Sequence, residues 1–499
     1  MMLSRVLVAN RGEIAVRVIR ACRELGIETV AVFSEADEGA PHVAAADRAV
    51  PIGPAPAADS YLASGRLIDA ARQTGADAVH PGYGFLAENA AFAQACTDAG
   101  LIFIGPSPEA IEQMGSKIES RRRAAQAGLP VVPGETPTAQ DAESIRHAAA
   151  RVGFPLLVKA SAGGGGKGMR VVERAADLDE AVSAARHEAH SAFGDGTLYL
   201  ERLLVRPRHV EVQVFGDTEG HVAHLFERDC STQRRHQKII EESPSPLLAP
   251  SLRGRLGDAA VALAQAIGYR SAGTVEFLVE GNGEQAHFYF LEMNTRLQVE
   301  HPVTEAVTGV DLVHAQLLVA SGAPLPWTQA QIALRGHALE CRVYAEDPSS
   351  GFLPQAGRLA LYREPQGPGI RVDSGVAEGG AVSVYYDPLL AKVITWGASR
   401  EVARRRAVAA LQRYPVLGVR TNIPFLIRVL EHERFREGGL DTAYLDHEGA
   451  PLCDHRSGPG LPAALAAAAL CRPTVAACSP AAGGVEAPDP WDRLRGWRQ

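Results

Sequence analysis

The sequence predicts a protein of mixed α/β and α+β class whose first region, residues 1–114, is a doubly wound, Rossmann-like domain. A strand at 5–9, a helix at 12–25 and a strand at 28–33 follow one another, and similar units continue to about residue 114. Alternating strands and helices indicate a parallel sheet covered by helices. A mixed segment with a glycine-rich loop (115–330) and a strand-rich block (335–446) complete the folded part.

Composition limits the class of protein. The 499 residues suffice for about two to four domains, and 46% apolar with 22% charged residues is typical of a soluble globular protein. No apolar run approaches the roughly 20 residues that a membrane-spanning helix needs. The net charge of −8 argues against broad nucleic-acid binding. Seven scattered cysteines, none in a CxxC pair, and no export signal after Met1 predict a cytoplasmic protein.

A glycine-rich stretch follows the predicted strand that ends in Lys159. Five of the six residues from 163 to 168 are glycine, and the sixth is Lys167. Glycines let backbone N–H groups approach a polyphosphate closely, and the two lysines would supply positive charge. The stretch is neither a GxGxxG fingerprint nor a Walker A sequence, so a flexible hairpin tip with two solvated lysines stays open as the alternative.

Four polar side chains alternate with apolar ones along residues 288–298. Residues two apart share one face of a strand, so they should project to one side if the extended conformation continues. They are Glu292, Asn294, Arg296 and Gln298. Carboxylate and amide oxygens suit Mg²⁺, a guanidinium beside them would hold an anion, and Glu276 on the predicted strand 273–279 would add a second carboxylate. The alternative is a pair of exposed amphipathic strands.

Two further stretches carry polar residues. In the strand 208–214, His209 and its polar neighbours alternate with valines, which is also typical of a half-buried surface strand. The dense Arg, His and Lys residues of 227–238 would neutralise phosphates and other small anions, or they form a solvated basic loop. Cys230 lies in this stretch without a recognisable base and orienting group, so we expect a buried thiol and not a nucleophile.

Together these stretches resemble the biotin carboxylase family of the ATP-grasp superfamily. The resemblance covers residues 3 to about 446 without a large gap, and its motifs occur in the order of the family. They are Val8–Ala15, His80–Leu86, Met114–Lys117, the glycine-rich stretch, Glu227–Lys238, Glu292–Glu305, Glu340–Asp347 and Tyr385–Val393.

The resemblance implies a role for each matching residue. ATP would be held by Lys117, Lys159, Gly165, Gly166, His209, Gln233 and His236, with adenine against the backbone of Glu201 to Leu204 and the side chain of Leu278. Mg²⁺, with Mn²⁺ as a possible substitute, would be held by Glu276, Glu292 and Asn294. Bicarbonate would lie among Lys238, Arg296, Gln298 and the backbone of Val299, with Glu300 as its base and Arg342 beside the biotin enolate.

The implied activity is the ATP-dependent carboxylation of biotin on a carrier protein. Deprotonated bicarbonate would attack the γ-phosphate to give carboxyphosphate, whose breakdown would release CO₂ beside biotin N1 while phosphate or an equivalent base removes the N1 proton. The implied fold places a central ATP-grasp domain at 115–330 and a biotin carboxylase C-terminal domain at 335–446. A glycine-rich lid at about 130–204 would close over the intermediate and exclude water.

The implied partners lie outside the catalytic region. Residues 447–488, rich in Ala, Pro and Gly, are predicted to be a linker, either a short helix or a disordered tether. Residues 489–499 resemble the start of a segment that docks the carboxyltransferase β subunit in acyl-CoA carboxylase α subunits. No Ala-Met-Lys-Met biotinylation motif occurs, so we expect biotin on a separate biotin carboxyl carrier protein or domain. The chain would then be either a fragment of a longer α subunit or a natural subunit. The family also implies a homo-oligomer.

One departure and three rivals remain. The family usually has an acidic residue where this chain has Ser116, and we expect little effect because Lys117 is the contacting group. A carbamoyl-phosphate synthetase half would lack the run 298–305 and the context of Arg342. Pyruvate and urea carboxylases begin with the same module, so the sequence of this module does not identify the acceptor of the carboxyl group. A nucleotide-binding regulatory protein that has lost catalysis is disfavoured, because it would not keep the complete charged set.

Overall fold

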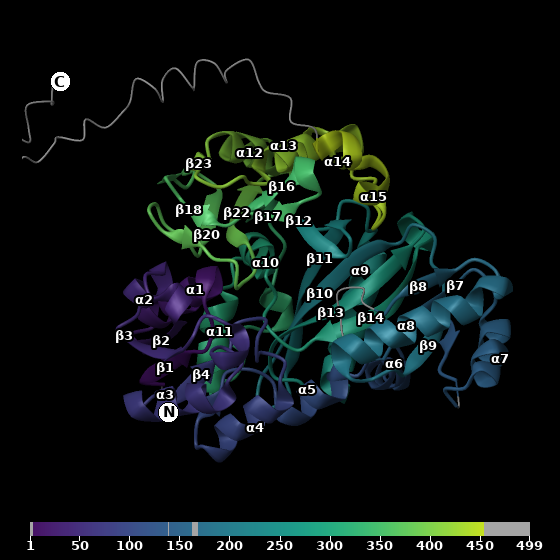
Figure 1. The fold of residues 1–499 in the computed structure, drawn as a ribbon, viewed down its shortest axis with the longest axis horizontal. Helices are drawn as coiled ribbons and strands as arrows, with labels where there is room; N and C mark the ends of the chain where they lie inside the picture. Colours follow the sequence, from purple (N-terminus) through teal and green to yellow (C-terminus); the bar gives the residue numbers. More distant parts are fainter. Residues whose placement is uncertain (1–2, 138, 162–167, 454–499) are drawn as a thin grey trace, which may run out of the picture. The chain divides into compact units, whose positions relative to one another are not determined.

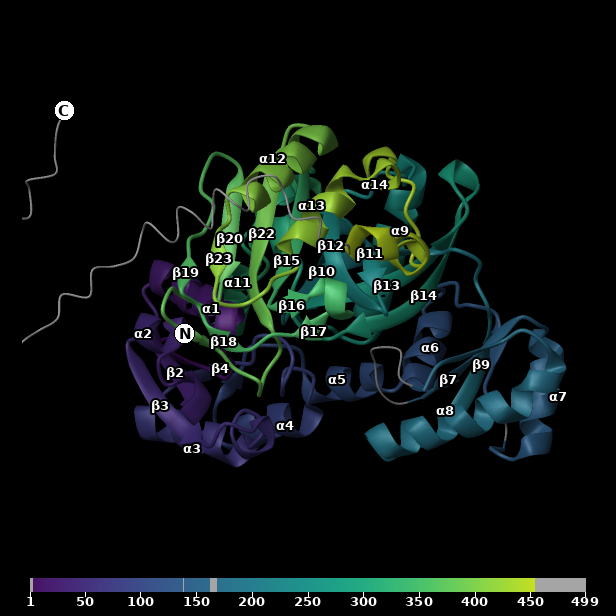
Figure 2. The same ribbon diagram turned by 45° about the horizontal axis from the view of Figure 1, so that its top comes forward.

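The computed structural model describes residues 3–137, 139–161 and 168–453, which are drawn in colour in Figures 1 and 2. They belong to one compact unit. The first residues of the predicted linker 447–488 are described and lie in the end of a helix (Tyr444–Glu448) and in a short 3₁₀ helix (Ala450–Cys453). The rest of the predicted linker and the predicted docking segment 489–499 lie outside the described residues.

A five-stranded parallel sheet in the order β3-β2-β1-β4-β5 confirms the doubly wound prediction for the N-terminal region. Its strands are β1 (Arg5–Val8), β2 (Glu28–Ser34), β3 (Arg48–Gly53), β4 (Ala78–His80) and β5 (Ile102–Phe103), with helices α1 (Gly12–Glu24), α2 (Pro41–Ala45), α3 (Ser64–Thr74), α4 (Ala90–Asp98) and α5 (Pro108–Gly115). Val6 and Val8 pack into the core that contains α1, whereas Leu7 packs into the core that contains α3 and α4. Both faces of the sheet are therefore covered, which explains its continuous apolar strands.

A four-stranded sheet, ordered β6-β9-β7-β8, carries the glycine-rich stretch. Its elements are β6 (Gly134–Glu135), β7 (Leu156–Ala160), β8 (Arg170–Val172) and β9 (Leu198–Arg202), which pack with α7 (Ala142–Val152) and α8 (Leu178–Phe193) around a small core of their own. The tip between β7 and β8, residues 162–167, lies outside the described residues, so the roles of Gly165, Gly166 and Lys167 stay predictions. Ser116 caps helix α6 (Lys117–Gln126) by accepting a hydrogen bond from the Glu119 amide at 3.4 Å.

An eight-stranded antiparallel sheet joins the central and C-terminal regions. Its order is β14-β13-β10-β11-β12-β15-β22-β20. The strands are β10 (Arg208–Gly216), β11 (Val222–Arg234), β12 (Gln237–Ser243), β13 (Ser271–Glu280), β14 (His287–Asn294), β15 (His337–Tyr344), β20 (Ile370–Ser374) and β22 (Leu389–Gly397). Ile240 of β12 lies opposite Cys341 of β15, so the sheet continues across residue 335, where a domain boundary stays a prediction.

This sheet decides three of the alternatives that the sequence left open. All nine residues of β10 are buried, so 208–214 is not a half-buried surface strand. The stretch 227–238 is not a solvated loop either, because it belongs to β11 and β12, and only the turn at 235–237 is exposed. The exposed-strand alternative for 273–279 is also wrong, since β13 is almost wholly buried.

Helices cover the large sheet. Helix α9 (Pro250–Ala266) packs on β10 and β11, and α12 (Arg400–Gln412) packs on β22 and β15. The other helices and short strands are α10 (His301–Thr308), α11 (Leu312–Ala320), α13 (Ile423–Glu431), α14 (Glu433–Glu437), α15 (Tyr444–Glu448), β16 (Glu346–Asp347), β17 (Leu353–Pro354), β18 (Gly357–Arg358), β19 (Leu361–Tyr362), β21 (Ala381–Val382) and β23 (Val416–Leu417). None of the described helices could cross a membrane alone, and α10 with α11 meets the length and hydropathy test only as a pair bent by 96°.

Replacing Leu339 by Ala should destabilise the protein, because Leu339 of β15 is 0% exposed in the core beneath the joined sheet. The cavity should lower the free energy of unfolding by about 2–5 kcal/mol, measured as a lower urea midpoint. The matched control is Leu353→Ala, since Leu353 is 60% exposed and its loss should change stability by less than about 0.5 kcal/mol. Equal midpoints for the two variants would contradict this role of β15.

Candidate functional site

One cavity of about 610 Å³ lies between the four-stranded sheet and the large sheet. Every predicted site residue in the described part of the chain lines it. These residues are Lys117, Lys159, Glu201, Leu204, His209, Gln233, His236, Lys238, Glu276, Leu278, Glu292, Asn294, Arg296, Gln298, Val299, Glu300 and Arg342. The structure thus brings together residues that the sequence spreads over more than two hundred positions.

The end of the cavity near the four-stranded sheet is apolar and bears two lysines. Its apolar lining includes Val132, Leu157, Leu203, Leu204, Leu278 and Leu291. Lys159 Nζ donates to Glu201 Oε2 at 3.0 Å, and although burial lowers the pKa of Lys159, Glu201 outweighs it and the pKa is raised. Burial lowers the pKa of Lys117, which Glu292 partly offsets. An apolar slot beside two lysines suits a flat heterocycle that carries phosphates.

Two carboxylates face each other across β13 and β14. Glu276 lies opposite Glu292 in the strand register, and Asn294 Nδ2 donates to Glu276 Oε1 at 2.8 Å. Burial and then the charge of Glu276 raise the pKa of Glu292, whose carboxylate accepts no hydrogen bond from the described residues. Like charges opposite one another destabilise a sheet unless a cation lies between them. Oxygen ligands of this kind fit Mg²⁺.

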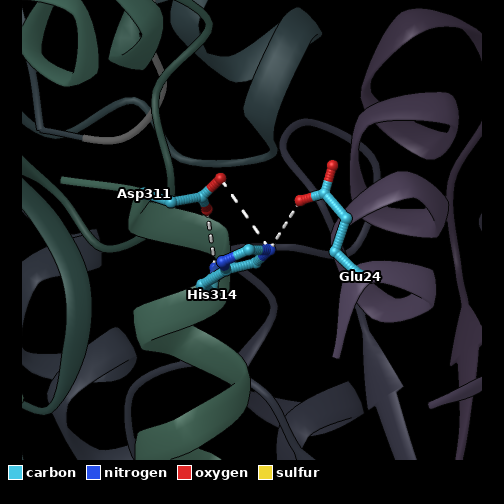
Figure 3. A group of neighbouring side chains, drawn as sticks. All are labelled: Glu24, Asp311 and His314. Atoms are coloured by element: carbon cyan, nitrogen blue, oxygen red, sulfur yellow. Dashed lines mark hydrogen bonds and ion pairs between the residues drawn. The ribbon is translucent and has the colours of Figure 1, made fainter. Parts of the chain in front are cut away.

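A second group of possible metal ligands lies away from the cavity. Figure 3 shows Glu24 of α1 facing His314 of α11 and Asp311, which caps the start of α11, with His314 Nε2 2.9 Å from Glu24 Oε2. Asp311 Oδ2 also forms an ion pair with Arg17 Nη2 at 2.8 Å. The group is partly exposed and its charges are already paired, so it acts as a contact between the two helices.

Lys238 stands among three buried carboxylates. Its Nζ donates to Glu211 at 2.5 Å, to Glu300 at 2.6 Å and to Glu276 at 2.9 Å. Burial alone would lower the pKa of Lys238, but the three carboxylates outweigh it and the pKa lies well above its ordinary value. We call these four residues the Lys238 cluster. Its lysine therefore stays charged at neutral pH.

Glu300 also bonds to a second cation. Arg342 donates to Glu300 Oε2 at 2.9 Å and to Glu241 at 2.5 Å. Burial opposes ionisation of Glu300, yet Lys238 and Arg342 outweigh it and hold the pKa of Glu300 well below its ordinary value. Cys230, whose Sγ lies 3.9 Å from Glu300, is buried with a pKa raised well above normal by burial, which confirms the expected buried thiol.

The strand prediction for 288–298 is wrong at its end. β14 stops at Asn294, so Arg296 and Gln298 lie in the following loop and not on the face of a strand. They reach the same cavity because Arg296 donates to the Asn294 Oδ1 at 3.2 Å and to Gln298 Oε1 at 3.0 Å. Glu88 accepts from Arg296 Nε at 2.8 Å and fixes the guanidinium from the other side.

Sequence reasoning missed three charged residues beside the site. They are Glu211, Arg228 and Glu241. Arg228 is 0% exposed and donates to Glu211 Oε1 at 2.6 Å, so its positive charge offsets part of the negative charge of the Lys238 cluster. Burial outweighs Arg342 and raises the pKa of Glu241 to about 7. The available signal was a charged residue within a predicted strand, such as Glu211 between the valines of β10.

Three family models match successive parts of the chain. They are "Biotin carboxylase, N-terminal domain" at 2–111, "Carbamoyl-phosphate synthase L chain, ATP binding domain" at 116–328 and "Biotin carboxylase C-terminal domain" at 340–447. The middle match alone would fit the carbamoyl-phosphate synthetase rival. The two flanking matches decide against it.

Curated relatives and solved structures agree with these matches. The methylcrotonoyl-CoA carboxylase subunit alpha of Oryza sativa is 50% identical over 94% of this chain, which spans only 64% of that protein. The biotin carboxylase domain dimer of the Hydrogenobacter thermophilus 2-oxoglutarate carboxylase, solved with MgADP, ADP and bicarbonate, has a TM-score of 0.87 and 47% identity, covering 91% of this chain and 100% of that one. The biotin carboxylase of Campylobacter jejuni has a TM-score of 0.86 and 44% identity over 89% of this chain and 99% of that one.

A match over nearly the full length of a relative settles the family. The biotin carboxylase of Halalkalibacterium halodurans is 51% identical over 89% of this chain and 97% of that protein. Together with a cavity that gathers the described site residues of the resemblance, this match shows that the chain belongs to the biotin carboxylase family.

Proposed function

We propose that this chain uses ATP and bicarbonate to carboxylate biotin at N1, the first half-reaction of a biotin-dependent acyl-CoA carboxylase. The observation that carries the proposal is the single cavity with three chemical parts. Its apolar end suits adenine, its opposed carboxylates suit Mg²⁺, and Glu300 lies among cations that suit bicarbonate.

Glu300 is the base in this proposal. Its depressed pKa keeps it ionised at neutral pH, but the hydrogen bonds from Lys238 and Arg342 make it a weak base. A bicarbonate anion bound beside Lys238, Arg296 and Gln298 would compete with Glu300 for the positive charge of Lys238. Glu300 would then lose part of its stabilisation, and its proton affinity would rise at the moment a proton must be removed.

The cations have a second task after bicarbonate is deprotonated. Attack on the γ-phosphate would form carboxyphosphate and release ADP, and Lys117, Lys159 and His236 would hold the phosphates. Mg²⁺ held by Glu276, Glu292 and Asn294 would supply positive charge to the phosphate oxygens. When carboxyphosphate breaks down to CO₂ and phosphate, the phosphate would take the N1 proton of biotin, and Arg342 would offer donors to the enolate oxygen. N1 would then attack CO₂ to give N1-carboxybiotin.

The partners of the reaction follow from the chemistry and from the family. Biotin must arrive on a carrier protein or domain, and a carboxyltransferase β subunit must accept the carboxyl group. The dimeric relative supports a homo-oligomer for this chain. The rice relative is an α subunit, which supports an acyl-CoA carboxylase. A cytoplasmic location and the docking role of 489–499 stay predictions.

With MgATP present, bicarbonate should start ADP formation by the purified protein, and free biotin should accelerate it. Replacing Glu300 by Gln keeps its shape but removes its basicity, so bicarbonate-dependent ADP formation should fall by about 10²- to 10⁴-fold. Coupled assays for ADP check both results. The affinity for MgATP should stay within about threefold, because ATP does not depend on this base. A parallel loss of ATP binding and bicarbonate activation would contradict the role of Glu300.

Affinity for Mg²⁺ should fall as the pH is lowered from neutral. The pKa of Glu292 is raised, so Glu292 becomes protonated earlier than an ordinary carboxyl as the pH falls, and a protonated carboxyl cannot bind Mg²⁺. Glu292→Gln should weaken Mg²⁺ activation by at least about tenfold and remove this pH dependence. Titrating ADP formation with Mg²⁺ at several pH values measures both. The exposed Glu284→Gln variant serves as the control and should behave as wild type. An unchanged pH dependence in Glu292→Gln would exclude Glu292 as a ligand.

A further inference from the structure

A buried lysine in β22 contacts the segment that carries the proposed base. Lys392 is 0% exposed in an otherwise apolar strand, and its Nζ donates to the Val299 carbonyl oxygen at 2.8 Å. The same Nζ lies 3.0 Å from Glu13 Oε1, at the start of α1. The motifs Val8–Ala15 and Tyr385–Val393, which carry none of the roles assigned above, therefore meet beneath residues 299 and 300, and the second also reaches the cavity through Asp387.

A third motif completes this contact. The Tyr83 hydroxyl, from His80–Leu86, donates to Glu13 Oε1, and the Lys392 ammonium lies 5.9 Å from the centre of the Tyr83 ring. Burial lowers the pKa of Lys392, but Glu13, Glu340 and Asp373 outweigh it and the pKa is raised. Lys392 thus remains a charged donor, and its position is fixed from the N-terminal region.

The geometry around Val299 shows what this donor does. Arg342 of β15 lies directly opposite Lys392 of β22, so two neighbouring cations hold two consecutive residues, the Glu300 carboxylate and the Val299 carbonyl. On the other side, His301 Nδ1 donates to the Gln298 carbonyl at 2.7 Å. Because peptide groups are planar, anchoring these two carbonyls fixes the amides of residues 299 and 300 as well.

We propose that Lys392, oriented by Glu13, is a positioning residue that holds the Val299–Glu300 peptide in the geometry required for bicarbonate binding and deprotonation. Lys392 is not among the residues that line the cavity, so it acts through Val299 and not on the substrate. The inference rests on the proposed function. A displacement of about 1 Å at a reacting group costs up to about 100-fold in rate. A Val299–Glu300 peptide that is free to shift would therefore lower the rate of the reaction.

The experiment must separate positioning from folding. Lys392→Met alone leaves Glu13 buried without its cation, which destabilises a protein strongly. The double variant Glu13→Gln with Lys392→Met removes both charges and restores neutrality, but it still lacks a donor for the Val299 carbonyl. The matched control is Arg404→Met, because Arg404 of α12 also donates to a backbone carbonyl, that of Leu430 at 3.0 Å, and pairs with Glu401 at 2.7 Å.

Each variant is assayed for ADP formation against bicarbonate and against ATP, with Tm as the measure of folding. Wild type must first show bicarbonate-dependent ADP formation; if it does not, the proposed function itself is wrong. For the double variant we expect kcat/KM for bicarbonate to fall about 10- to 100-fold while the KM for ATP stays within about threefold. Arg404→Met should keep both constants.

Three results would overturn the role of Lys392. The double variant could match wild type with bicarbonate, which would mean that Val299 needs no donor. It could lose ATP and bicarbonate function in parallel, which would indicate general damage. If neither Lys392 variant folds while Arg404→Met does, the residue serves folding and not positioning.

Discussion

The ammonium of Lys238 between three buried carboxylates is the interaction on which the site depends. Glu211 comes from β10, Glu276 from β13 and Glu300 from the loop before α10, so one charge ties three segments together. Removing one partner of a buried ion pair costs about 3–5 kcal/mol, because the remaining charge is left without compensation. Arg228 and Arg342 balance the excess of acid, and the cluster is stable only as a complete set.

This balance also explains how the site can handle an anion. Lys238, Arg228 and Arg342 each bond to a carboxylate of the chain, so the charges of these three cations are paired. In the proposed reaction, an entering bicarbonate would replace or share those bonds and would find its donors already oriented. The proposed increase in the basicity of Glu300 then requires no movement of the backbone, only a redistribution of hydrogen bonds. Anchoring of the Val299–Glu300 peptide by Lys392 fits the same requirement for a rigid backbone.

Much of the site was predictable because its signals are local. Glu276 and Asn294 lie on strands with clear alternation, and Lys159 lies on the strand before the glycine-rich stretch, which ends one residue later than expected, at Ala160. Arg296 was placed in the cavity for the wrong reason, since β14 ends before it and hydrogen bonds, not strand periodicity, direct its side chain. Local patterns also identified the parallel N-terminal sheet, whose strands and helices alternate along the chain.

Other parts could not be predicted from local patterns. The joining of β12 to β15 depends on a pairing between segments about a hundred residues apart, which no periodicity encodes. The roles of Glu13 and Lys392 could not be predicted separately, because they depend on the ion pair between these two residues. A lysine in an apolar strand is nevertheless itself a signal. Buried charges of this kind are specified by tertiary partners, and residue spacing carries no information about those partners.

The central claim is that bicarbonate, and not water, attacks the γ-phosphate of ATP. The most direct measurement uses bicarbonate labelled with ¹⁸O in a reaction with MgATP and biotin, followed by mass spectrometry of the phosphate. Carboxyphosphate keeps the attacking oxygen on phosphorus when it breaks down, so each phosphate released should carry one oxygen from bicarbonate. ADP formation with phosphate labelled only by the solvent would mean hydrolysis by water and would contradict the account.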